Sequence, residues 1–147
     1  MQPAVETTPN IQLIEDHWPL LWVRFSGKAS DAEFRRYLDR MTELLDSGRK
    51  SAHILDGRGV TQTTPQQRRM QADWIAQNRE KIRRNILLTS FVIDSAIVRG
   101  ALTAVLWLQN IPHNYKVVKN FNEALELATE QLRAAGLEVP DLTKLRG

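Results

Sequence analysis

Short apolar runs alternate along this chain with stretches in which apolar residues recur every three or four positions. The short runs predict strands, which lie at residues 11–15, 20–26, 52–55, 86–93 and 115–119. The first two strands are close enough in sequence to pair as an antiparallel hairpin. The run at 86–93 is almost continuously apolar, with one Thr and one Ser, which favours a strand buried on both faces.

The longer stretches predict four main helices. The first begins after the capping sequence Ser30-x-x-Glu33 and ends at Gly48. The second begins with Thr64 as N-cap and Pro65 at the first helical position. The predicted ranges of the second, third and fourth helices are 65–84, 96–110 and 121–135.

This order of elements predicts a single α/β domain. Strands that alternate with helices imply right-handed crossovers, so we expect a five-stranded mixed sheet with an N-terminal antiparallel hairpin and a largely parallel remainder. We expect residues 1–10 to form a flexible leader, 11–136 the domain and 137–147 a C-terminal tail. Of the four tryptophans, Trp22 and Trp107 lie in apolar runs and are expected in the core.

The composition of the chain excludes several classes of chemistry. The chain has 147 residues, a net charge of +3 and no cysteine, which excludes disulfides and thiolate chemistry. No apolar run is long enough to cross a bilayer, and the first ten residues are polar, so we expect a cytoplasmic protein. The three histidines lack metal-ligand spacing, and no nucleophile or phosphate-binding motif is present. We therefore expect no enzyme, no metal and no cofactor, and nucleic acid is disfavoured as a partner.

A partner surface is predicted around the segment from Asp56 to Thr64. This segment follows an apolar strand, and in open α/β sheets partners bind beyond the carboxyl ends of strands. On a helical wheel, arginines of the second helix lie opposite its apolar face, and an arginine pairs bidentately with carboxylates. The residues predicted to bind an acidic protein are Asp56, Arg58, Thr61, Thr63, Arg68, Arg69, Arg79 and Arg83. A merely solvated face is the alternative, and a homo-oligomer is left open.

Two further chemistries lie in the same segment. Thr61 and Thr63 are candidate phosphorylation sites, because a phosphate there would gain from the helix dipole and from Arg68. Asp56 and Asp94 each end a strand and together could hold Mg²⁺. We favour the simpler interpretation, that each carboxylate caps its own turn.

Five stretches resemble STAS-like domains related to bacterial anti-sigma-factor antagonists (SpoIIAA-like domains) and the neighbouring SEC14-like lipid-binding group. They cover roughly residues 11–135 and read LLWVRFSG, ILDGRG, TPQQRRMQADWI, FVIDSAIVRGALTAVLWL and KVVKNFNEALELA. The resemblance implies a non-enzymatic regulatory or scaffold module that acts through protein–protein contact. The antagonists carry a phosphorylatable serine in the turn before a helix, but the loop after Leu55 has none, and Asp94-Ser95 lies one strand later. Their partner-switching mechanism is therefore not carried over.

The alternative that the resemblance implies is a SEC14-like carrier of a lipid or small ligand. A carrier needs a cavity between sheet and helices, which Gly100, Ala101 and Ala104 of the third helix could line. Small residues equally permit close packing of helix on sheet. An apolar cavity of several hundred Å³ would favour the carrier, and a packed core would favour the interaction module.

Overall fold

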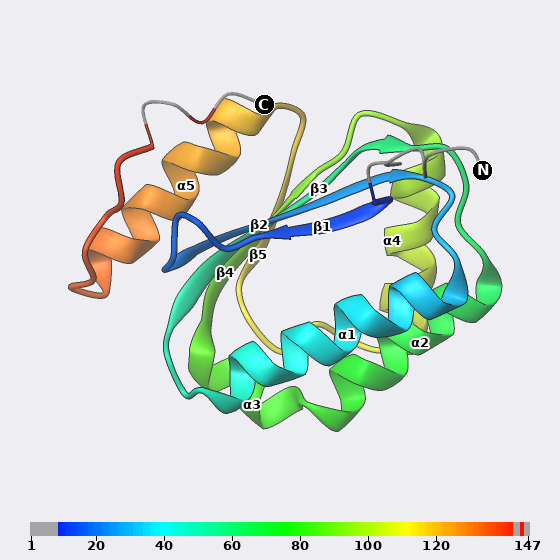
Figure 1. Cartoon of the computed structure of the whole chain (residues 1–147), viewed down its shortest axis with the longest axis horizontal. Coiled ribbons are helices and arrows are strands. Elements are labelled where there is room, and N and C mark those ends of the chain that lie inside the picture. The colour runs from blue at the N-terminus through cyan, green and yellow to red at the C-terminus, as the bar shows by residue number, and fades with distance from the viewer. Residues whose placement is uncertain (1–8, 143–144, 146–147) are drawn as a thin grey trace, which may run out of the picture.

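A mixed five-stranded sheet with helices on both faces is seen in the computed structural model, which describes residues 9–142 and 145 (Figure 1). The strands are β1 (Ile11–Ile14), β2 (Leu20–Gly27), β3 (Ser51–Val60), β4 (Ile86–Val92) and β5 (Tyr115–Val118). The helices are α1 (Asp31–Asp46), α2 (Pro65–Gln77), α3 (Arg79–Asn85), α4 (Ala96–Leu108) and α5 (Phe121–Ala134).

The strands lie side by side in chain order, from β1 to β5. β1 pairs antiparallel with β2, and each later pair is parallel, which confirms the predicted mixed sheet. Figure 1 shows α1, α2, α3 and α4 on one face of the sheet and α5 on the other. We call these the four-helix face and the α5 face.

The second predicted helix was wrong as one continuous element. It is divided at Asn78, whose backbone leaves the helical region with φ −114° and ψ 16°. The Asn78 side chain and its backbone N–H both donate to the carbonyl oxygen of Trp74, each at 3.0 Å. The described residues therefore contain five helices rather than four.

The third predicted strand was too short. It continues to Val60 because Ser26 and Gly27 of β2 pair with Gly59 and Val60. The predicted loop from Asp56 to Thr64 is therefore wrong in its first half, and the connection to α2 is residues 61–64. Glycines at this end of the strand favour a loop locally, and pairing with β2 overrides that preference.

Both predicted helix N-caps form. The residue that completes each capping sequence, Glu33 or Gln67, makes a tertiary contact. The hydroxyls of Ser30 and Thr64 accept from the backbone N–H of Glu33 and Gln67, each at 3.1 Å. The Glu33 carboxylate accepts from the backbone N–H of Ile11 at 3.0 Å instead of returning to Ser30. The capping sequence thus also fixes the start of β1 against α1.

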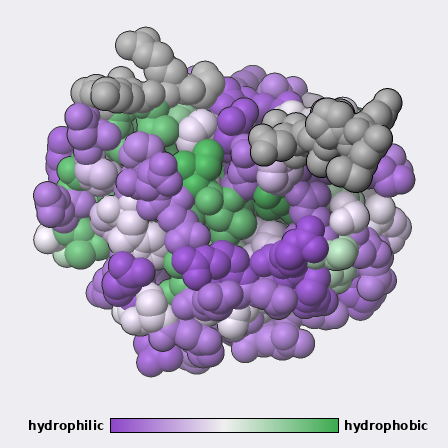
Figure 2. All heavy atoms as spheres, in the orientation of Figure 1, coloured by the Kyte–Doolittle hydropathy of each residue, from purple (hydrophilic) through white to green (hydrophobic). Residues whose placement is uncertain are grey.

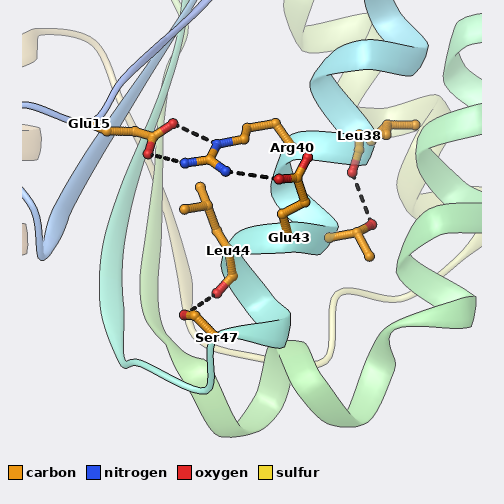
Figure 3. Close-up of polar contacts among 7 residues, drawn as sticks. Glu15, Leu38, Arg40, Glu43, Leu44 and Ser47 are labelled. Carbon is orange, nitrogen blue, oxygen red and sulfur yellow. Dashed lines mark hydrogen bonds and ion pairs between the residues drawn. The ribbon is translucent and has the colours of Figure 1, made fainter.

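Arg40 fixes the other end of β1 against the same helix (Figure 3). Its guanidinium donates to both Glu15 carboxylate oxygens, at 2.9 and 2.6 Å, and to Glu43 at 3.1 Å. The hydrogen bonds from Arg40 hold the pKa of the Glu15 carboxyl below its ordinary value. At the end of α1, the Ser47 hydroxyl donates to the carbonyl oxygen of Leu44 at 2.6 Å.

Apolar side chains form one core on each face of the sheet. Core residues of the four-helix face include Leu21, Val23, Tyr37, Leu38, Met41, Leu45, Met70, Trp74, Ile75 and Ile82. Core residues of the α5 face include Leu20, Trp22, Ala52, Ile54, Val92, Phe121, Ala124, Ala128 and Leu132. Leu137, Val139 and Leu142, in the predicted tail, pack against this second core. Residues 1–8, most of the predicted leader, lie outside the described residues.

Hydrophobic surface lies on both sheet edges and on α4. Figure 2 shows a largely hydrophilic face with hydrophobic atoms in its middle, where the edge strand β1 lies in Figure 1. At the opposite edge, Tyr115 and Val117 of β5 are exposed. Trp107 of α4 is 87% exposed, so the prediction that it belongs to the core was wrong, whereas Trp22 is buried as expected. Among the described helices, none combines the length and apolar character needed to cross a membrane.

Candidate functional site

An apolar pocket of about 180 Å³, partly open to solvent, lies between the sheet and the helices of the four-helix face, and we call it the cavity. Its walls come from β2, β3, β4, α1, α2 and α4 and from the segment before β5. The lining is almost entirely apolar and includes Phe25, Phe34, Leu55, Phe91, Val105 and Ile111. Natural interiors contain few voids larger than a water molecule, so a cavity of this size needs a physical cause.

The cause is the position of α4, which packs mainly against α2 and covers the sheet incompletely. Val105 is its one buried residue, although nearly the whole helix is apolar. Near its start, α4 passes close to Gly57 of β3, where a Cβ atom would lie only 2.7 Å from Val98 Cγ1. One turn further on, Ala101 lines the cavity and is too small to fill it.

The predicted cavity residues of α4 therefore divide between two sides of the helix. Ala101 lines the cavity, as the carrier hypothesis requires. Gly100 and Ala104 lie instead along a shallow outer groove beside Trp107. A Cβ added at Gly100 would meet no atom within 4 Å, so this glycine does not serve close packing on the sheet.

Three hydrogen-bonded pairs lie in the cavity lining. The Tyr37 hydroxyl donates to Gln71 Oε1 at 3.1 Å, and Arg68 Nη1 donates to Thr63 Oγ1 at 2.8 Å. Burial raises the pKa of the Tyr37 phenol, which therefore stays protonated. The third pair joins Thr89 Oγ1 and His113 Nε2 at 2.6 Å.

His53 is buried and His113 is half-buried, and burial keeps both rings neutral at physiological pH. Burial lowers the pKa of His113 to about 4. Burial, with a smaller contribution from the charge of His113, lowers the pKa of His53 to about 3. His53 Nε2 lies 2.8 Å from Ser51 Oγ, whereas His113 Nδ1 is buried with no hydrogen-bond partner among the described residues.

Asp56 and Arg58, predicted as partner-binding residues, lie on the α5 face rather than beside α2. The Asp56 carboxylate accepts from the Arg58 guanidinium at 2.9 and 2.7 Å and from Trp22 Nε1 at 3.3 Å. The Arg58 guanidinium lies 5.4 Å from the centre of the Phe121 ring. Burial alone would raise the pKa of the Asp56 carboxyl, but the hydrogen bonds from Arg58 and Trp22 hold it below its ordinary value. This pair of a buried carboxylate and a half-buried guanidinium anchors the start of α5 to the sheet.

The arginines that were predicted to lie on one face of the helix 65–84 are divided between two helices at Asn78. Arg79 and Arg83 belong to α3, where Arg79 donates to the carbonyl oxygen of Asn110 at 3.0 Å and Arg83 pairs with Glu80 at 3.2 Å. The interpretation that the arginines of residues 65–84 share one continuous helix face was therefore wrong. The residues that remain together belong to the 61–64 connection and the first turns of α2.

We call Thr61, Thr63, Arg68 and Arg69 the α2-start surface. Thr61 and Arg69 are exposed, and Thr63 and Arg68 are half-buried. Thr63 and Arg68 also line the cavity, so this surface and the cavity share two side chains. A role of these residues in binding a partner, or of Thr61 and Thr63 in accepting a phosphate, stays a prediction.

The Mg²⁺ alternative finds no support in the arrangement of the acidic residues. Asp56 is occupied by Arg58, and Asp94 is exposed after the end of β4. In residues 9–142 and 145, no three histidine, aspartate or glutamate side chains are grouped so that they could hold a metal ion.

His113 was not predicted as a site residue, and the cavity was predicted only as the alternative of a carrier. The single Thr in the apolar run 86–93 is the sequence signal that points to His113, because Thr89 is a polar residue in a strand buried on this face. Its partner, His113, lies 24 residues away in a segment expected to be a turn, and the sequence alone does not join the two.

No family model and no curated protein matches this chain. A solved structure is similar: the crystal structure of an uncharacterised protein of the DUF3478 family, with a SpoIIAA-like fold, from Shewanella loihica PV-4. The similarity has a TM-score of 0.52 and 14% sequence identity, and it covers 86% of this chain and 99% of the other. It shows that this chain has a SpoIIAA-like fold, as the resemblance implied. At this identity the likeness extends to the fold alone.

We expect Asp56→Ala to destabilise the protein by about 2–3 kcal/mol, because it leaves the half-buried Arg58 guanidinium and the Trp22 N–H without their acceptor. Urea unfolding at neutral pH measures this difference. Asp16→Ala is the control and should change the free energy of unfolding by less than about 0.5 kcal/mol, because Asp16 is exposed. Equal losses in the two variants would contradict the anchoring role of Asp56.

We expect the free energy of unfolding to fall as the pH is lowered from about 7.5 to 5.5. The pKa values of His113 and His53 are lowered to about 4 and 3, from 6.5, so below pH 6.5 the unfolded chain binds protons that the folded protein excludes. At one pH unit below 6.5, each histidine costs about 1.4 kcal/mol, or about 2–3 kcal/mol for the pair.

Urea unfolding at both pH values measures this dependence, and ordinary carboxyl groups stay ionised throughout that range. His113→Asn should remove about half of the dependence. A stability that is equal at the two pH values, or a dependence unchanged by His113→Asn, would show that these rings are not buried in the neutral form.

Proposed function

We propose that this chain is a non-enzymatic module that binds a compact apolar molecule in the cavity beneath α4. The observation that carries this proposal is the apolar cavity of about 180 Å³. An engineered cavity of roughly 150 Å³ in another protein stays dry and binds benzene, so a space of this size and chemistry suits a small apolar ligand.

The cavity volume restricts the carrier hypothesis. A volume of about 180 Å³ is smaller than the several hundred Å³ that we expected to favour a carrier, and it is also more space than a packed core leaves. It matches a molecule of about one aromatic ring rather than a whole lipid. The small-ligand form of the SEC14-like alternative is therefore the form that the geometry supports, and an acyl chain would require α4 to move away from the sheet.

A second candidate is the regulatory or scaffold module that binds a protein with an acidic surface. The observation that favours it is that Thr63 and Arg68 belong both to the cavity lining and to the α2-start surface. A ligand at this end of the cavity would contact two of the side chains that we expect at the docking surface. Because Arg68 Nη1 already lies 2.8 Å from Thr63 Oγ1, a phosphate on Thr63 would also find a cation beside it.

We expect wild-type protein to bind toluene and Ala101→Leu to bind it at least about tenfold more weakly, because the larger side chain occupies the cavity. Titration followed by methyl chemical shifts measures the affinity. Ala104→Leu is the matched control: the same change on the outer side of the same helix should leave the affinity unchanged. Absence of toluene binding to the wild-type protein, or equal affinity in the Ala101→Leu and Ala104→Leu variants, would contradict the proposal.

For the second candidate, we expect the double variant Arg68→Glu and Arg69→Glu to weaken binding of a protein isolated with the wild-type chain from its native cell. The loss should exceed about tenfold at low salt, and wild-type binding should weaken as salt screens these charges. Arg35→Glu with Arg36→Glu is the matched control, because it makes the same charge change at exposed positions of α1. Unchanged affinity in the α2 variant would remove this surface from consideration.

A further inference from the structure

The outer side of α4 exposes more large apolar side chains than any other element in the part of the chain that the structure describes. Trp107 is 87% exposed, and Ile97 and Leu108 of the same helix are also exposed. An exposed tryptophan with exposed apolar neighbours is typical of a binding surface. The shape and the charge of α4 indicate what this surface binds.

A shallow groove lies beside Trp107 on the outer side of the helix. The residues that line it are Ala96, Arg99, Gly100, Thr103, Ala104 and Trp107. Glycine is unfavourable inside a helix, and a Cβ atom at Gly100 would meet no atom within 4 Å. Gly100 therefore has no packing role within the chain, but it allows a second helix to approach closely.

Trp107 and the groove fill each other when two copies of α4 pack antiparallel about a two-fold axis. An axis that passes between Thr103 and Ala104 lies three and a half positions from both Gly100 and Trp107, or about 5 Å along the helix. It therefore places Trp107 of one copy opposite Gly100 of the other. On a helical wheel these two residues lie within about 20° of each other, so both face the second copy. Symmetry repeats the contact, so each copy supplies one tryptophan and one groove.

Charge does not oppose this arrangement. Arg99 is the one charged residue of α4. The two-fold axis separates the two Arg99 positions by about 14 Å along the helices, which exceeds the Debye length of about 8 Å at physiological salt.

The exposed area is sufficient for a weak dimer. Trp107 alone exposes roughly 200 Å². With the groove and with Ile97 and Leu108 at the rim, each copy would bury roughly 500 Å². The total of about 1,000 Å² reaches the lower limit for a specific interface.

We propose that the protein forms a weak two-fold dimer in which Trp107 of each copy inserts into the groove over Gly100 of the other. The α4 surface is thus covered by a second copy of this chain. Because this surface and the cavity lie on opposite sides of α4, the inference is independent of the proposed ligand-binding function.

Sedimentation velocity of the intact protein, measured from about 10 μM to about 1 mM, tests the proposal. We expect the wild-type protein to dimerise reversibly with a Kd of about 10–100 μM, because the interface is small. Trp107→Ser should raise this Kd at least about tenfold, because it removes the inserted side chain. A wild-type protein that stays monomeric at about 1 mM would overturn the inference.

Gly100→Leu distinguishes this dimer from unspecific association of apolar surfaces. Leucine favours the helix and its Cβ atom meets nothing in its own chain, so the fold should be kept. In the proposed dimer the added side chain fills the groove and should raise the Kd at least about tenfold. Unspecific association would instead become stronger, because the exposed apolar area grows.

Ala32→Leu is the matched control for that variant, because it adds an exposed leucine to α1 and should leave the Kd unchanged. Dimerisation of Gly100→Leu that is as strong as that of the wild-type protein, or stronger, would overturn the inference.

A single introduced cysteine tests the position of the axis. The chain contains no cysteine, and Thr103 lies beside the proposed axis, next to Thr103 of the other copy. We expect Thr103→Cys to form a disulfide-linked dimer on mild oxidation, because the two cysteines come within bonding reach. Ala32→Cys should form little at the same concentration. Equal yields of linked dimer in the two variants would overturn the proposed arrangement.

Discussion

Right-handed crossovers between strands that follow chain order place every connecting helix on the same face of a sheet. In this protein the constraint puts α1, α2, α3 and α4 on one face and leaves the other to α5, the helix that follows the last strand. The α5 face is closed by Phe121 against Trp22 and by the ion pair of Asp56 and Arg58. The four-helix face has more helices, but α4 packs mainly against α2, and the cavity lies where its cover of the sheet is incomplete.

Local sequence patterns predicted the type and order of the elements because caps, turns and periodicity are local properties. They were least successful where a distant contact decides the outcome. Gly57 and Gly59 indicate a loop by composition, but β3 continues through them because β2 supplies pairing partners. Asn78 divides the predicted helix because its backbone leaves the helical region, and a wheel assumes helical backbone throughout. Trp107 lies in an apolar run, but whether such a residue is buried depends on where the rest of α4 packs.

The candidate site was harder to predict than the fold. Asp56 and Arg58 were grouped with Thr63 and Arg68 by nearness in sequence, but alternation along β3 sends the Asp56 side chain to the α5 face. The cavity is a space that side chains from several elements surround but do not fill, so no sequence motif indicates it. What the sequence did supply was the alternative of a ligand space lined by small residues of the helix 96–110, and Ala101 fulfils it.

The central claim of this account is that the space beneath α4 is an apolar cavity able to take a ligand. Xenon binds dry apolar cavities and gives strong anomalous scattering, so diffraction from crystals of the protein under xenon pressure tests the claim most directly. The account predicts a xenon site enclosed by Phe91 of β4 and by Ala101 and Val105 of α4. Side chains that close this space, or ordered waters there with no xenon, would contradict it.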